Sequence, residues 1–153
     1  YVQDGVSRYQ GVEAAFSWLL THDLSVNGSV SYLDARYVRA AAGYKGHKLE
    51  AVAPFQAALN AEYRIRKIKG LSVNGGFNFI SRSWLDAANS IRLPSYIVGN
   101  IGASYATQAF GKPIVFRAAV ENIGNERYWL SRGNMNLFPG APRTVTLSAR
   151  LDL

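Results

Sequence analysis

The side chains that most often carry catalysis are scarce in this chain of 153 residues. It contains no cysteine, which excludes disulfides, thiol nucleophiles and Cys-based zinc or iron–sulfur sites. Its two histidines are His22 and His47, which we expect in a short turn and in a long loop at opposite ends of the molecule. An acid–base or nucleophile constellation needs such groups close together. The sequence therefore predicts no catalytic residue, no metal site and no resident cofactor, and it argues against an enzyme.

Side chains suited to ligand binding gather in three stretches that we expect to be long loops. Arginine and tyrosine in such loops hold anionic or oxygen-rich ligands through charge-assisted hydrogen bonds and ring contacts. The candidate ligand-binding residues are Tyr37, Arg39, Tyr44, Trp84, Trp129 and Arg132. Two alternatives stay open for each of them. Basic side chains also neutralise lipid phosphates, and aromatic side chains also pack loops.

Composition leaves few classes of protein open. Hydrophobic residues make up 48% of the chain and charged residues 18%, which excludes intrinsic disorder. The length allows one domain, and no stretch approaches the ~18 apolar residues of a membrane helix. The net charge of +7 suits nucleic acid, acidic lipid or an anionic ligand. Because the basic residues are scattered and form no contiguous surface with stacking aromatics, we do not expect nucleic-acid binding.

Apolar and polar residues alternate with a period of two through most of the chain. This pattern predicts strands with one apolar and one polar face. The predicted strands are residues 12–20, 24–32, 55–66, 71–79, 97–105, 114–121 and 145–153. Asn27-Gly28 and Asn74-Gly75 are hairpin signals inside two of these strands. The alternation passes through both without a change of phase, so we expect continuous strands in an all-β, antiparallel, up-and-down fold.

The connections between these strands alternate in length. The short ones are 21–23, 67–70 and 108–113, and the long ones are 38–53, 84–94 and 127–142. Short turns on one side and long loops on the other are typical of an outer-membrane β-barrel. Aromatic residues near the ends of the apolar series fit the girdles of such a barrel: Trp18, Tyr32, Tyr63, Phe79 and Tyr105.

Seven strands do not complete such a barrel. Single-chain bacterial barrels have even strand numbers, and an open sheet in lipid leaves edge groups unpaired. The last apolar series reaches Leu153, as a true C-terminal strand would. We therefore expect a transmembrane barrel segment whose missing part lies on the N-terminal side.

Four short motifs carry a family resemblance. Residues 8–13 read RYQGVE, 93–96 read LPSY, 120–129 read VENIGNERYW and 140–144 read GAPRT. Together they resemble the strand motifs of TonB-dependent outer-membrane receptors, and within these the siderophore receptors. Such receptors usually end in Phe or Trp, where this chain has Leu153. By the same resemblance, Tyr128 and Trp129 lie at the upper rim and Arg143 is a residue of the fold.

The resemblance implies a 22-stranded barrel plugged by an N-terminal domain, with residues 1–153 as the C-terminal part of the barrel domain and the plug and first strands outside the chain. It implies a multi-pass protein of the bacterial outer membrane that takes up a ferric siderophore, which brings its iron already chelated. The implied partners are the siderophore, the receptor's own plug, the TonB complex through the missing N-terminal region, and lipopolysaccharide with outer-membrane lipid. The alternative function is a passive porin or a small structural barrel, which would lack a plug.

Overall fold

Strands account for the regular structure of the chain. The computed structural model describes residues 5–40, 43–109 and 111–151, and its elements there are all strands. No helix long and apolar enough to cross a membrane occurs in this part of the chain. The strands are β1 (Val6–Leu19), β2 (Leu24–Arg39), β3 (Phe55–Arg64), β4 (Leu71–Ile80), β5 (Ser83–Trp84), β6 (Arg92–Leu93), β7 (Tyr96–Ala109), β8 (Lys112–Glu121), β9 (Trp129–Ser131), β10 (Leu137–Pro139) and β11 (Thr144–Leu151). The all-β prediction is confirmed.

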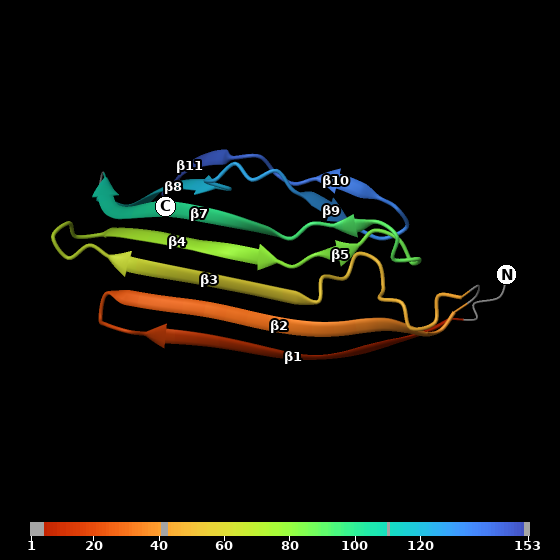
Figure 1. Cartoon of the computed structure of the whole chain (residues 1–153). Helices are drawn as coiled ribbons and strands as arrows, with labels where there is room; N and C mark the ends of the chain where they lie inside the picture. The colour runs from red at the N-terminus through yellow and green to blue at the C-terminus, as the bar shows by residue number, and fades with distance from the viewer. Residues whose placement is uncertain (1–4, 41–42, 110, 152–153) are drawn as a thin grey trace.

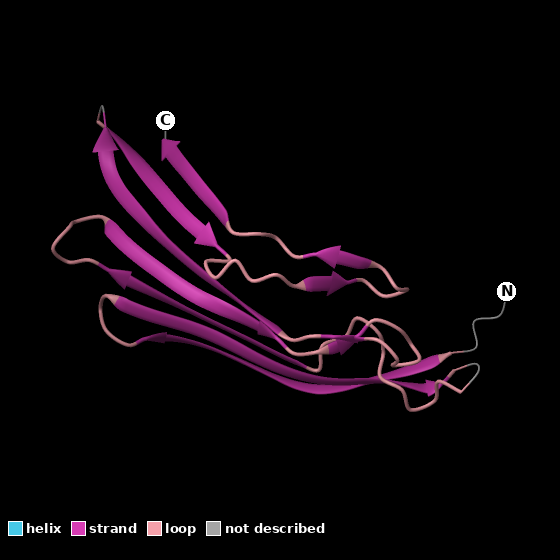
Figure 2. Ribbon diagram, turned by 45° about the horizontal axis from the view of Figure 1, so that its top comes forward, coloured by secondary structure: helices cyan, strands magenta, loops and turns pink. Residues whose placement is uncertain are grey.

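The long strands of the described residues form one antiparallel sheet in the order β1-β2-β3-β4-β7-β8-β11 (Figure 1). Each long strand pairs with the next long strand along the chain, which is the predicted up-and-down order. Two short hairpins, β5 with β6 and β9 with β10, extend beyond one end of this curved sheet (Figure 2). Each of the seven predicted strands corresponds to one strand of the sheet. The final strand was expected to reach Leu153, which lies outside the described residues.

One face of the sheet is apolar from edge to edge. Val30 on β2 lies opposite Ala14 on β1 and Ala57 on β3, and the same matching continues across the sheet. The side chains on this face are exposed or half-buried, with exposed fractions that reach 63% for Trp18 and 76% for Leu147. An exposed surface this apolar is suited to lipid rather than water. We call it the outer face, and the polar face opposite it the inner face.

The packed core lies among the long connections and at the end of β2 that they cover. The buried hydrophobic residues of the described chain are Ala35, Ala53, Leu85 and Leu93. Three of these four lie between the long strands, in the segments that follow β2 and β4. A barrel wall one sheet thick has lipid on one side and the lumen on the other. Burial among the described residues therefore occurs where the connections pack on one another or on the end of β2.

Aromatic side chains mark both borders of the outer face. Near the long connections, Tyr32 lies opposite Phe55, and the rings of Phe55 and Phe79 are 6.0 Å apart. Near the short turns, the border is formed by Trp18, Tyr63, Tyr105 and Phe116. Tyr63 and Phe55 stand at opposite borders of β3 and are about eight residues apart, or about 27 Å at roughly 3.4 Å per residue. This span matches the apolar band of an outer-membrane barrel, which is ~25 Å tall.

The two Asn-Gly sites lie inside strands, as predicted. β2 runs through Asn27-Gly28 and β4 runs through Asn74-Gly75 without a break in pairing. A Cβ atom on Gly28 would lie 2.5 Å from ring atoms of Phe16 on β1. Glycine at this position therefore makes room for a neighbouring ring on the outer face, and it does not form a turn.

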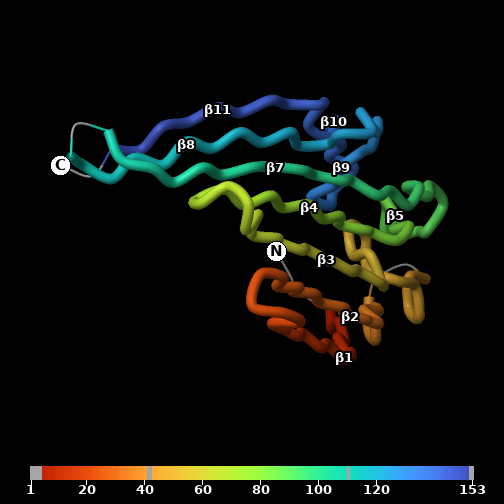
Figure 3. The backbone as a smooth tube through the Cα atoms, turned by 90° about the vertical axis from the view of Figure 1, so that its left-hand side faces the viewer, coloured from red at the N-terminus to blue at the C-terminus, as the bar shows by residue number. Residues whose placement is uncertain are grey.

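The short turns lie at one end of the sheet and the long connections at the other (Figure 1; Figure 3). We name the long ones the first (40–54), second (81–95) and third (122–143) connection. The prediction that the first loop begins near residue 38 and carries Tyr37 and Arg39 is wrong, because β2 continues to Arg39. This part of β2 pairs with the start of β1 through backbone hydrogen bonds. Beyond Tyr32 the outer-face positions of β2 are occupied by Asp34 and Arg36, so no apolar alternation marks this part of the strand in the sequence.

Candidate ligand-binding surface at the long connections

One asparagine makes two of the hydrogen bonds that hold the first and second connections together. The backbone N–H of Lys48 donates to Oδ1 of Asn89 at 2.9 Å, and Nδ2 of Asn89 donates to the Lys48 carbonyl at 2.8 Å. The Ala51 N–H donates to the Trp84 carbonyl at 2.7 Å nearby. Asn89 has a φ of 57°, a conformation that asparagine tolerates better than most residues. These bonds fix the two connections relative to each other.

The turn that presents Asn89 is built by Asp86. The carboxylate of Asp86 accepts the Ile91 N–H at 2.8 Å, the Ser90 N–H at 3.0 Å and the Ser90 hydroxyl at 2.7 Å. The hydrogen bond from the Ile91 N–H, followed by those from Ser90, lowers the pKa of this carboxyl group. The sequence 86–91 thus forms a compact turn held by its own polar side chains.

The third connection is anchored at its base by Asn122, which is 2% exposed. Its Nδ2 donates to the carbonyls of Glu126 and Ala141, both at 2.9 Å, and its Oδ1 accepts the Glu126 N–H at 2.8 Å. The Asn122 N–H donates to Oδ1 of Asn100 on β7. The Asn122 side chain therefore joins the start and the end of the third connection, and its backbone N–H ties them to the sheet.

A ring stack supports the same base. The rings of Tyr96 and Tyr128 are stacked with centroids 4.2 Å apart. Gly140 lies against this stack, since a Cβ atom there would come within 2.2 Å of the Tyr128 ring. The Arg143 N–H donates to Oδ1 of Asn125 at 3.1 Å. The ring stack is what a structural role of Tyr128 at the rim would require, whereas the Arg143 bond is made by its backbone and leaves the role of the Arg143 side chain a prediction.

Tyr37 lies on the inner face of β2, beyond the aromatic border at Tyr32 and outside the membrane-spanning part. Its hydroxyl donates to Oε2 of Glu50 in the first connection at 2.6 Å. Burial, and then the hydrogen bond to Glu50, raises the pKa of Tyr37 to about 12. The third connection approaches at this point, because a Cβ atom on Gly133 would lie 3.6 Å from Cγ of Glu50. Sequence reasoning missed Glu50, which no local pattern distinguishes from a solvated glutamate.

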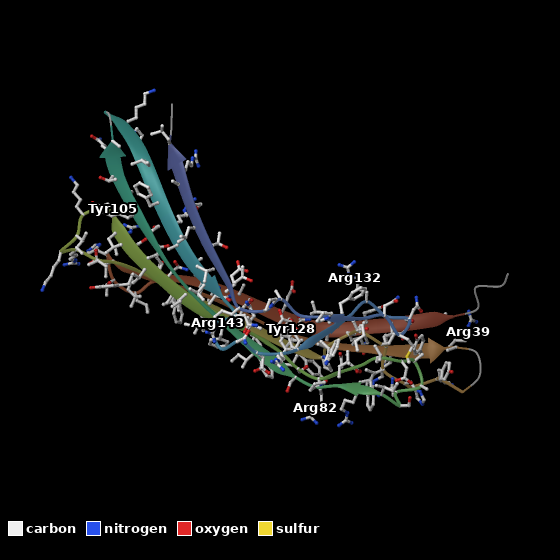
Figure 4. The ribbon with its side chains drawn as sticks, turned by 90° about the horizontal axis from the view of Figure 1, so that it is seen from above. Arg39, Arg82, Tyr105, Tyr128, Arg132 and Arg143 are labelled. Carbon is white, nitrogen blue, oxygen red and sulfur yellow. The ribbon has the colours of Figure 1, made fainter. Side chains whose placement is uncertain are left out.

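The structure places the other candidates as follows. Arg39 ends β2 at the long-connection end of the sheet (Figure 4), just beyond an irregularity in its pairing with β1. The ring of Tyr44 lies 5.9 Å from that of His47. Trp129 begins β9 with 49% of its surface exposed. The guanidinium of Arg132 lies 5.5 Å from the Phe138 ring centroid. All of them are at the long-connection end of the sheet.

A hollow of about 200 Å³ lies between the three connections on the inner side. Ala51, Ser83 and Trp129 contribute one wall from each connection, and Gln56 and Ile80 close it from the inner face of the sheet. Ligand pockets usually measure ~300 Å³ or more. The hollow is therefore smaller than a complete ligand pocket.

Trp84 faces the outer side of the long connections, opposite to the inner hollow. It lines a second pocket of about 240 Å³ with Lys48, Pro54, Arg82, Ser83 and Arg92. The guanidinium of Arg92 lies 4.7 Å from the Trp84 ring centroid. Figure 4 shows Arg82 and Arg132 on opposite sides of the sheet end, Arg82 on the convex one. The structure thus brings Tyr37, Trp129 and Arg132 toward the inner side and separates Trp84 from them.

A metal-binding site needs titratable side chains that lie close enough together to bind the ion. In that part of the chain, no group of three or more His, Cys, Asp or Glu side chains is placed to hold a metal ion. His22 lies in the turn between β1 and β2, and His47 in the first connection, at opposite ends of β2 as expected. The chemistry that the surface offers is hydrogen bonding by phenol and guanidinium groups, with aromatic rings beside them.

Comparison with known families decides what this sheet belongs to. The family model described as TonB dependent receptor-like, beta-barrel, matches residues 1–123. The chain belongs to the TonB-dependent receptor β-barrel family. Members of this family are receptors and transporters rather than enzymes, and their barrels lie in the bacterial outer membrane. The strands of this TonB-dependent receptor barrel cross that membrane several times.

Curated relatives extend the match to nearly the whole chain. The ferrichrome receptor FcuA of Yersinia enterocolitica is 26% identical over 151 residues, which cover 97% of this chain and 20% of the receptor. The ferrichrome outer membrane transporter/phage receptor of Escherichia coli K12 is 31% identical over 152 residues, with coverages of 97% and 20%. The chain therefore spans about a fifth of the length of these relatives.

Solved structures confirm the architecture. The ferric preacinetobactin receptor BauA of Acinetobacter baumannii matches with a TM-score of 0.92 and 33% identity, covering 99% of this chain and 23% of that receptor. The ferric citrate transporter FecA in its unliganded form matches with a TM-score of 0.83 and 19% identity, covering 95% and 24%. The sheet described above is thus a segment of a larger TonB-dependent receptor barrel.

Proposed function

We propose that the chain forms part of the barrel wall of an energy-coupled outer-membrane receptor, and that its inner rim contacts a ferric siderophore. Relatives named as receptors for ferrichrome, ferrioxamine and ferric preacinetobactin support this ligand class. The related proteins are receptors, and this favours the proposal over a passive porin. We further propose that residues 1–153 are the C-terminal part of the barrel domain. The complete barrel would enclose an N-terminal plug, and the TonB complex would supply energy for uptake by binding to a region outside this chain.

One observation carries the proposed contact surface. Strand β2 and the third connection, which carry three of the candidates, both approach residues 50 and 51 of the first connection. Tyr37 hydrogen bonds to Glu50, the segment after Arg132 approaches Glu50, and Trp129 shares the inner hollow with Ala51. The surface so formed offers a guanidinium and an exposed indole to a ligand that enters from outside.

This chemistry fits a metal chelate. The oxygen atoms of a siderophore accept charge-assisted hydrogen bonds from arginine, and its flat faces contact aromatic rings. The chelate itself fills the coordination sphere of the iron, so the protein needs no metal ligand and no resident cofactor. We propose no catalytic role for this surface.

Ligand binding to the whole receptor tests the proposal. Ferrichrome, ferrioxamine and ferric preacinetobactin serve as probes, with quenching of tryptophan fluorescence as the readout. Arg132→Gln and Trp129→Ala should each raise the Kd of the cognate probe by about tenfold, the value of one charge-assisted hydrogen bond or one ring contact. Arg64→Gln, which removes an inner-face charge at the opposite end of β3, is the control and should leave the Kd unchanged. If both rim variants bind every probe as tightly as the wild type, this rim is not the contact surface.

A further inference from the structure

Hollows follow one another along the inner face of the sheet, over strand β3. The inner hollow between the long connections is closed by Gln56 and Ile80. A second hollow of about 470 Å³ is lined by the same two residues and continues over Ala58 of β3 and Ser29 of β2. The two hollows therefore adjoin. We call the second one the middle hollow.

A third hollow of about 560 Å³, the lower hollow, lies on the same face near the short turns. Ser72 and Ser104, whose hydroxyl oxygens are 2.8 Å apart, belong to its lining. Its charged lining residues are Glu62, Arg64, Arg66 and Lys69. Cations outnumber carboxylates among them, which favours an anionic occupant. The middle and lower hollows both fall within the size range of ligand pockets, which is ~300–1,000 Å³.

Two asparagines lie between the middle and lower hollows. On β3, Ala58 lines the middle hollow and Glu62 the lower one, so Asn60 stands between them on the same face. Asn74 on β4 lies opposite Glu62. We call Asn60 and Asn74 the amide belt. Because β3 runs from the long connections to the short turns (Figure 1), the hollows and the amide belt follow the height of the barrel wall.

Glycines on the neighbouring strands make room for the amide belt. A Cβ atom on Gly76 of β4 would collide with Oδ1 of Asn60, and one on Gly102 of β7 would lie 2.8 Å from Oδ1 of Asn74. Each asparagine side chain therefore lies over the glycine of the next strand rather than straight into the lumen. Both asparagines are exposed, and within the described part of the chain neither side chain forms a hydrogen bond.

Free amide groups suit the passage of a polar solute. An amide offers donors and an acceptor without charge. A transport path needs contacts that are favourable enough for the solute to enter and weak enough for it to leave. The wall at β8 is different, because Arg117 and Glu121 flank Ala119 there with opposite charges on the inner face.

We propose that the ferric siderophore passes along the wall over β2, β3 and β4, and that Asn60 contacts it between the middle and lower hollows. The inference rests on the proposed function and adds the side of the barrel and the residue. Its support is that the middle hollow shares Gln56 and Ile80 with the candidate ligand-binding surface and that the lower hollow is rich in cations. A plug that always covers the amide belt is the competing occupant.

Binding and uptake by the whole receptor test the proposal with Asn60→Trp. The probe is whichever of ferrichrome, ferrioxamine and ferric preacinetobactin the wild type takes up. Asn60→Trp should lower the maximal uptake rate at least about tenfold, because the ring obstructs the path. Its Kd should stay within about twofold of the wild type, which also shows that the variant is folded. Asn60→Ser keeps a small polar group and should transport normally.

Ala119→Trp is the matched control, since Ala119 is an inner-face residue that lines neither hollow. It should leave both Kd and uptake rate unchanged. Wild-type uptake by Asn60→Trp, or an equal loss in Ala119→Trp, would overturn this inference alone. No uptake of any chelate by the wild type would overturn the proposed function and this inference with it.

Chemical labelling gives a test that does not depend on the folding of a bulky variant. The chain contains no cysteine, so Asn60→Cys introduces one thiol into it. A benzyl methanethiosulfonate reagent, added to cells during uptake, should modify the Asn60→Cys receptor and slow uptake, and a reductant should restore the rate. The wild type treated in the same way is the control. Failure of the reagent to reach this position during uptake would show that the plug covers it and would overturn the proposal.

Discussion

The hydroxyl of Tyr37 donates a 2.6 Å hydrogen bond to Oε2 of Glu50 and so ties the end of strand β2 to the first connection. The bond gives Tyr37 a measurable signature, because burial and the Glu50 carboxylate raise its pKa to about 12 from the ordinary value of about 10. The neutral phenol is favoured in the folded protein. The stabilisation is therefore complete below about pH 10 and is lost as the pH rises through about 12.

Replacement of Tyr37 by phenylalanine should remove this late titration. Ultraviolet difference spectroscopy of the whole receptor should show a tyrosine that ionises near pH 12 in the wild type and is missing in Tyr37→Phe. Tyr44→Phe removes a phenol from the same rim without touching Glu50 and should leave that late phase in place. Coincident curves for the wild type and Tyr37→Phe would show that the bond is absent.

Asn89 should control the mobility of the first connection. Replacing it with alanine removes two hydrogen bonds to Lys48 and puts a less tolerant residue at a φ of 57°. The local opening free energy should fall by about 1–3 kcal/mol, and limited proteolysis within 40–54 should be at least about fivefold faster. Asn89→Gly relieves the backbone but not the lost bonds, so it should be cleaved at an intermediate rate. Cleavage of both variants at the wild-type rate would contradict the clamp.

Gly140 should tolerate no larger residue, because the stacked ring of Tyr128 occupies the space of a Cβ atom. Gly140→Ala must displace the Tyr96–Tyr128 stack at the base of the third connection, and this overpacking should cost about 1–3 kcal/mol of stability. Urea denaturation of the whole receptor would measure it. Gly124→Ala is the matched control, since a Cβ atom there meets nothing within 4 Å. A Gly140→Ala receptor as stable as Gly124→Ala would show that the stack is not packed this way.

Residues 1–153 expressed alone should not form a stable monomeric barrel. Within the described chain, β1 and β11 are the two ends of the sheet, and each pairs on one side only. Unpaired edge groups in lipid or detergent cost several kcal/mol each, so the piece should aggregate or associate through its edges. A protease-resistant monomer that shifts its electrophoretic mobility on heating would contradict this expectation.

The strands of the sheet could be predicted because lipid on one face and water on the other force strict alternation. Outside the membrane this constraint is absent, and the strands there were not predicted. The extension of β2 through Tyr37 and Arg39 lies above the membrane and carries no alternation. The hairpins β5–β6 and β9–β10 contain two or three residues per strand, too few for a period to show.

The candidate site was predicted less completely than the fold. The candidate tyrosines, tryptophans and arginines do lie at one end of the sheet, because the long connections that were expected to carry them all lie at that end. Whether each of these side chains faces the inner or the outer side depends on local breaks in the strand alternation. The successive residues Ile80 and Ser81 both line the inner hollow, so the alternation is broken between them. Trp84 then faces the outer side, in the same pocket as Arg82. Partners such as Glu50 and Asn89 depend on contacts between different connections, which no single stretch of sequence reveals.

Iron uptake by cells that carry the whole receptor tests the central claim most directly. Cells starved of iron and lacking their own siderophores would be offered radioactive iron as ferrichrome, ferrioxamine or ferric preacinetobactin, with and without a proton uncoupler. We predict saturable uptake of one of these chelates that stops when the uncoupler removes the energy supply, and that weakens in Arg132→Gln. Uptake that persists with the uncoupler, or that admits unrelated small solutes at the same rate, would identify a passive pore and contradict the account.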